Sequence, residues 1–111
     1  MRIEMKGRNV PIGADLRERV EKKFAKVARQ VSSQADMEVE LSEERNPSIR
    51  ESQVVDVTLH LKGRTLRVRE ASEDMVRSIN LAADDLARQV KRYRDKRRKR
   101  REAHRSSPRL V

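Results

Sequence analysis

The sequence predicts an α+β fold: a β-α-β-β-β-α two-layer sandwich with two helices on one face of a four-stranded sheet. Short segments with a residue period of two alternate with two longer segments whose apolar residues recur at the helical period. Each predicted element has one apolar face, so the helices and the sheet are expected to bury these faces against each other. With 111 residues, the chain is long enough for one domain and too short for two independent ones.

The first two predicted elements are a strand at residues 1–6 and a helix that begins near Ala14. In the strand, Met1, Ile3 and Met5 alternate with charged residues. In the helix, five apolar residues recur at steps of three or four and fall within a sector of about 80°. They are Leu16, Val20, Phe24, Val27 and Val31. This narrow stripe predicts a helix that buries one face.

Three further strands are predicted at residues 37–41, 55–61 and 66–69, where apolar and polar residues alternate again. An exposed loop over residues 42–52 separates the first two of them, and Lys62-Gly63 forms a tight turn before the last. Because a helix separates the strands at 1–6 and 37–41, we expect them to be parallel neighbours. The last three strands should form an antiparallel meander.

The second helix is predicted to follow Ser72, a suitable N-cap residue. Its apolar stripe begins at Met75 and stops at Tyr93, because the next inward positions are cations. If the helix continues, it must leave the sheet and project into solvent. We therefore expect an ordered domain at residues 1–95, followed by a basic tail or linker at residues 96–111, which we expect to be disordered.

The positive charge of the chain is concentrated in one segment. Lys and Arg number 28 against 18 Asp and Glu, and the formal net charge is +10. The segment from Arg88 to Arg105 contains eleven of the cations and only two of the acids. Such a surplus points to a polyanionic partner, since cations packed this densely repel each other unless an anion lies against them.

The cations of the two helices are the predicted nucleic-acid-binding residues. On the first helix they occupy one flank, at about 220–340° from Leu16, whereas an ordinary solvated helix mixes acids and bases. The predicted residues are Lys22, Lys23, Lys26 and Arg29 of the first helix and Arg88, Lys91, Arg92 and Arg94 of the second. The alternatives are a merely solvated helix face and a solubilising tail.

Other classes of function find little support in the sequence. There is no cysteine, the only two histidines lie in no motif, and the three glycines form no phosphate-binding loop. We expect no catalysis, no metal, no cofactor and no small-molecule substrate. The apolar runs are too short for a membrane span, and the first residues lack the apolar block of a secretory signal, so a cytoplasmic protein is expected. With two aromatic residues, the chain offers no base-stacking platform on a strand face, so RNA shape and backbone charge should dominate binding.

Three segments, in this order, resemble the ribosome hibernation promoting factor family. They are LRERVEKKFAKV at 16–27, SEDM at 72–75 and DLARQVKR at 85–92. The family includes the ribosome-associated inhibitor and sigma-54 modulation proteins, and the resemblance covers about residues 1–95. It implies a fold similar to double-stranded RNA-binding domains. It also implies binding to rRNA of the small ribosomal subunit, in the channel used by mRNA and tRNA, which blocks translation in stationary phase or starvation.

The resemblance also bears on single residues. It places the family's rRNA-contacting cations on Lys23, Lys26 and Arg29 of the first helix and on Arg88 and Arg92 of the second. Asp85 stands where the family commonly has a cation, so a phosphate contact at that position is not expected.

Longer family members carry a C-terminal domain that pairs ribosomes, so pairing is expected only if such a domain follows this chain. Two descriptions of the chain stay open: a short form, or the N-terminal part of a longer protein. Two alternative functions also stay open. One is a general RNA- or DNA-binding module or transcription modulator, and the other is a protein–protein scaffold.

Overall fold

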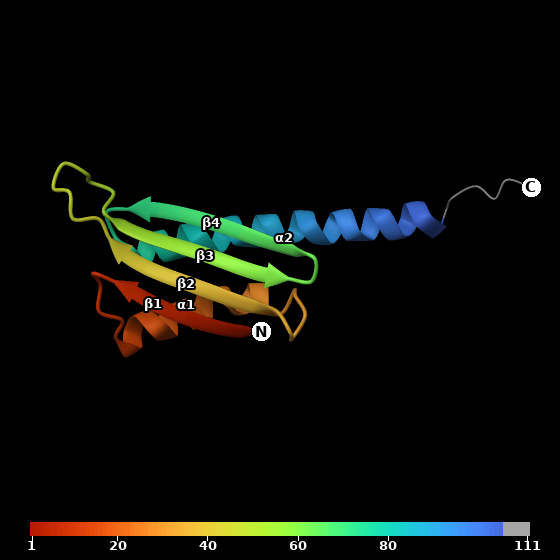
Figure 1. Ribbon diagram of the computed structural model, residues 1–111, viewed down its shortest axis with the longest axis horizontal. Coiled ribbons are helices and arrows are strands. Elements are labelled where there is room, and N and C mark those ends of the chain that lie inside the picture. Colours follow the sequence, from red (N-terminus) through yellow and green to blue (C-terminus); the bar gives the residue numbers. More distant parts are fainter. Residues whose placement is uncertain (106–111) are drawn as a thin grey trace, which may run out of the picture.

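The structure is a computed structural model that describes residues 1–105, with side chains through Arg101. The part of the predicted tail beyond residue 105 lies outside the described residues. The chain forms six elements in the predicted order (Figure 1). They are β1 (Arg2–Arg8), α1 (Ala14–Ala28), β2 (Asp36–Glu43), β3 (Gln53–Leu61), β4 (Arg64–Ser72) and α2 (Met75–Arg105).

The four strands form one sheet in the order β1-β2-β3-β4. β1 pairs with β2 in parallel, and the other two pairs are antiparallel. Figure 1 shows both helices on the same side of this sheet. The predicted fold class, pairing and layer order are therefore confirmed.

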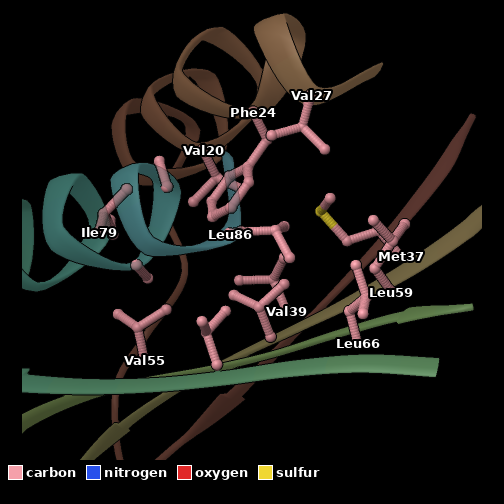
Figure 2. Packing of buried hydrophobic residues seen from close by; sticks show 14 of the residues in the cluster. Val20, Phe24, Val27, Met37, Val39, Val55, Leu59, Leu66, Ile79 and Leu86 are labelled. Carbon is pink, nitrogen blue, oxygen red and sulfur yellow. The ribbon is translucent and has the colours of Figure 1, made fainter. Parts of the chain in front are cut away.

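The core lies between the sheet and the two helices. Val20, Phe24 and Val27 of α1 and Ile79 and Leu86 of α2 are at most 1% exposed. Figure 2 shows their side chains directed toward those of the strands. Register aligns the inward residues of neighbouring strands, for example Met37 with Leu59 and Val39 with Val57. The apolar stripes read from the sequence are thus the buried faces.

The strands are longer than their alternating patterns indicated. β2 extends to Glu43 and β3 begins at Gln53, two residues before the predicted start. The reason is that alternation detects only residues with a buried side, whereas backbone hydrogen bonds continue along the hairpin. The Glu44 amide, for instance, donates to the Ser52 carbonyl oxygen at 2.8 Å. At the β3–β4 turn, Gly63 adopts a φ of +77°, a conformation that favours glycine.

The start of α2 differs from the prediction. Ser72 is the last residue of β4, and the helix begins at Met75, so Asp74 directly precedes it. The Ser72 hydroxyl still accepts a hydrogen bond from the Asp74 amide at 3.3 Å, and it lies 2.6 Å from the Ser78 hydroxyl oxygen. Ser78 in turn donates to the Gln53 carbonyl oxygen at 2.6 Å. Ser72 is therefore a buried link between the sheet and α2 rather than the N-cap.

α2 continues well past its apolar stripe. It comprises 31 residues, a length of about 47 Å at about 1.5 Å per residue. Figure 1 shows its C-terminal half extending beyond the end of the sheet. The expected domain boundary at residue 95 lies within this helix, and residues 96–105 are helical.

Candidate nucleic-acid interface

The four predicted cations of α1 lie in solvent. Lys22, Lys23, Lys26 and Arg29 are exposed, whereas the central residues of the apolar stripe beside them are buried. Among the described residues, no ion pair involves any of these four. Their charges are therefore available to an anionic partner.

The four predicted cations of α2 are also exposed, and one of them is paired. The Arg88 guanidinium lies 3.7 Å from the Asp85 carboxylate, one helical turn earlier. Asp85 thus places a negative charge beside a predicted contact residue, which reduces the positive potential there. Lys91, Arg92 and Arg94 have no such carboxylate partner in the described part of the chain.

A groove opens where α2 leaves the body of the protein. It has a volume of about 850 Å³ and lies between α2, the segment Gln30–Ser32 after α1, and Leu61 and Lys62 at the β3–β4 turn. We call it the corner groove. Seven cations line it: Lys62, Arg88, Lys91, Arg94, Arg97, Arg98 and Arg101. The one carboxylate among the described lining residues is Asp95, which pairs with Arg98 at 3.9 Å. The groove therefore has a strong positive excess.

The corner groove gathers only part of the predicted set. Arg88, Lys91 and Arg94 line it, whereas Arg92 and the four cations of α1 do not. The predicted set did not include Lys62, Arg97, Arg98 and Arg101. The three arginines could have been found by continuing the steps of three and four along the helix. Arg97 follows Tyr93 by four residues, Arg98 follows Arg94 by four, and Arg101 follows Arg98 by three. Lys62 could not have been found in this way, because it comes from a turn far away in the sequence.

Tyr93 connects α2 to the rim of this groove. Its hydroxyl donates to the Lys62 carbonyl oxygen at 3.5 Å. The Arg97 guanidinium donates to the same hydroxyl at 3.3 Å and lies 5.9 Å from the centre of the Tyr93 ring. This distance suits a cation–π contact. The pair holds a guanidinium plane beside an aromatic ring at the groove.

The opposite face of the sheet has a different charge pattern. Its two central strands present carboxylates, among them Glu38 and Asp56. His60 lies 3.5 Å from Glu38, and Arg69 pairs with Asp56 at 3.2 Å. Acids and bases are mixed on this face, whereas seven cations of the corner groove stand beside a single carboxylate among its described lining residues.

The structure offers little for other classes of site. Within residues 1–101, whose side chains are described, no three His, Cys, Asp or Glu residues come close enough to hold a metal ion. None of the helices in the described part of the chain is both long and apolar enough to cross a membrane.

Comparison with known proteins identifies the family. The sequence model of the family described as sigma 54 modulation protein / S30EA ribosomal protein matches residues 3–98. The chain belongs to this family. Membership confirms the resemblance found in the three segments of the sequence, and the match reaches into the basic part of α2.

Relatives within the family carry the name ribosome hibernation promotion, or promoting, factor. The protein of Salmonella typhimurium is 33% identical over 96 residues, which cover 86% of this chain and 96% of that protein. That of Picosynechococcus sp. is 30% identical over 97 residues, or 86% of this chain and 50% of that protein. The Deinococcus radiodurans protein is 32% identical over 107 residues, which cover 95% of this chain and 55% of that protein. The chain thus spans about half the length of the last two relatives.

Two solved structures share the fold. The N-terminal domain of Thermus thermophilus Protein Y superposes with a TM-score of 0.71 at 32% identity, covering 84% of this chain and 99% of that one. A ribosomal subunit interface protein from Coxiella burnetii superposes with a TM-score of 0.73 at 26% identity, and the match covers 86% of this chain and 99% of that one. Both matches include almost the whole of the solved chain, so the fold described above is that of the family.

Proposed function

We propose that this chain is a ribosome hibernation factor that inhibits translation without catalysing a reaction. It binds rRNA of the small ribosomal subunit through the cations of α1 and α2 and occupies the channel used by mRNA and tRNA. The names of the relatives and of the Coxiella protein support the ribosome as partner. The corner groove, with seven cations and one carboxylate, is the observation that carries the rRNA contact.

The direction of the two helices supports a single shared surface. α1 runs antiparallel to β1 and β2, and α2 runs antiparallel to β4, which has the same direction as those strands. Both helices therefore run the same way, and their side chains turn clockwise when each is viewed from its N-terminus.

On α2, the flank that faces α1 can be assigned from contacts. Gln89 donates to the Arg67 carbonyl oxygen of β4 at 3.1 Å, so its flank faces the β4 edge. Lys91 and Arg94 line the corner groove with Gln30–Ser32, so their flank faces α1. Viewed from the N-terminus of α2, this flank lies about 100° clockwise from the centre of its buried stripe.

On α1, the flank that faces α2 must then precede the buried stripe by a similar angle. On the helical wheel, Lys23 and Lys26 lie about 60–120° before the centre of that stripe. Lys22 and Arg29 follow toward solvent. The cations of both helices would then border the same valley on the helical side of the sheet, and a backbone of phosphates could lie along it.

This binding requires position and charge but no bond formation. The cations of α2 from Arg88 to Arg101 extend over about 20 Å, so they can contact several phosphates at once. Each neutralised phosphate releases counterions, so affinity should fall steeply as salt rises. Inhibition then follows from exclusion of mRNA and tRNA.

Sedimentation of ribosomal subunits tests the proposal. The protein should co-sediment with small subunits at low salt and be released at high salt, while large subunits under the same conditions serve as the control. A prebound mRNA with its tRNA should lower the amount that binds, and the protein should inhibit cell-free translation in proportion to occupancy. Equal affinity for free duplex RNA and small subunits would instead support a general RNA-binding module.

A further inference from the structure

The floor of the corner groove differs from its rim. Four half-buried apolar side chains form it: Val31, Leu61, Ala87 and Tyr93. They pack against the core and are only partly buried, and the Arg97 guanidinium lies over the Tyr93 ring. The groove thus combines four apolar side chains with seven cations.

We propose that the corner groove accommodates a single unpaired nucleotide of the bound RNA, its base against the apolar floor and its flanking phosphates on the cations. This inference rests on the proposed function, because it specifies which kind of RNA element the basic surface takes. An RNA nucleotide has a flat base and a phosphate on each side, which matches a floor bordered by positive charge. The volume of about 850 Å³ is within the range of pockets that enclose small ligands, roughly 300–1,000 Å³.

The groove suits an unpaired base better than it suits a continuous duplex. Bases that are splayed out of RNA stack on aromatic rings and on guanidinium planes. Arg97, held over the Tyr93 ring at 5.9 Å from its centre, supplies a guanidinium plane against which a base can stack. A continuous duplex would place only phosphates here and would leave the apolar floor unused.

The extent of the cations argues for RNA rather than a free mononucleotide. Arg88 and Arg101 both line the groove, yet they are separated by about 20 Å along α2. One mononucleotide cannot contact cations over that distance, whereas the strand on either side of a splayed-out base can.

The test compares two RNA hairpins that differ by one bulged nucleotide. The bulge carries 2-aminopurine, whose fluorescence reports stacking, and the chain contains no tryptophan and only one tyrosine, Tyr93. We expect the bulged hairpin to bind at least about fivefold more tightly than the fully paired one, since stacking of one base contributes roughly five- to 150-fold in affinity. An excess of adenosine monophosphate should not displace the bulged hairpin. Full displacement would mean that the groove binds a free mononucleotide, and the assignment to a nucleotide within RNA would be wrong.

Two variants and one control separate the floor from the rim. Ala87→Leu fills the floor and Tyr93→Leu removes the ring, and neither changes the charge. In both, the preference for the bulge should fall to about one, while Ala14→Leu on the exposed start of α1 should keep it. Circular dichroism confirms that each variant is folded. Equal affinity of the native protein for both hairpins, or a preference that both variants retain, would refute the inference.

Co-sedimentation with small subunits, measured in parallel, distinguishes this inference from the proposed function. If subunits bind but the bulge gives no preference, only the inference fails. If the bulge is preferred but subunits do not bind, the proposed function fails and the groove remains a site for an unpaired nucleotide.

Discussion

Removal of four cations from the helical side should weaken ribosome binding in a way that depends on salt. We consider the variant in which Lys23, Lys26, Lys91 and Arg94 are replaced by alanine. All four are exposed and lack an ion-pair partner in the described part of the chain, so folding should be unaffected. The formal net charge falls by four from +10.

The magnitude follows from counterion release. Each phosphate contact contributes roughly 0.7–0.9 to the slope of log affinity against log salt, so four contacts contribute about 3. At 0.1 M salt, the variant should bind small subunits about a thousandfold more weakly, and near 1 M the difference should vanish. Fluorescence anisotropy of labelled protein, titrated with small subunits at four salt concentrations, measures the slope directly.

The matched control removes the same charge from the other face. Arg2, Lys6, Arg8 and Arg67 are exposed on the side of the sheet opposite the helices, and their replacement by alanine also removes four positive charges. Arg2 pairs with Glu4 at 3.1 Å, whereas the other three have no carboxylate partner among the described residues. If rRNA lies on the helical side, this control should change the slope by less than about 1. Equal loss of slope in both variants would mean that net charge, rather than the helical surface, determines binding, and the assignment of the interface would be wrong.

Three further predictions concern stability. Phe24→Ala should lower the free energy of unfolding by about 3–5 kcal/mol, because the Phe24 side chain of α1 is fully buried in the core. Urea denaturation measures this loss, and Phe24→Leu should lower the free energy of unfolding by less. Gly63→Ala should cost about 1–2 kcal/mol, because φ is +77° at this turn, and an unchanged midpoint of thermal unfolding would contradict the turn geometry. Lys96→Glu should stabilise the exposed part of α2 by about 0.2–0.5 kcal/mol for each arginine four residues away on either side, seen as slower amide exchange there; faster exchange would argue against a helix beyond Tyr93.

Much of the fold could be predicted because the signals are local. Strand and helix periods depend on which side chains of one segment face the core, and Val20, Phe24 and Val27 are buried as their spacing indicated. The predicted boundaries were wrong where an element's end does not depend on buried apolar side chains. The ends of β2 and β3 depend on backbone hydrogen bonds, and the start of α2 depends on a buried hydroxyl contact between Ser72 and Ser78.

The site was predicted less completely than the fold. Sequence spacing identified the cations of each helix, and all eight predicted residues are exposed. It could not show that Arg88, Lys91 and Arg94 line a groove that Arg92 does not. Their role in binding rRNA stays a prediction.

By itself, the sequence determined the element order, the buried face of each element and the concentration of positive charge in α2, because these properties depend on neighbours within a few residues. Only the tertiary structure decided where that charge meets an apolar floor. Lys62 joins the arginines of α2 because β3 and β4 turn back beside the point where the helix leaves the sheet. Contacts between such distant segments arise from packing of the whole domain, and no local pattern encodes them.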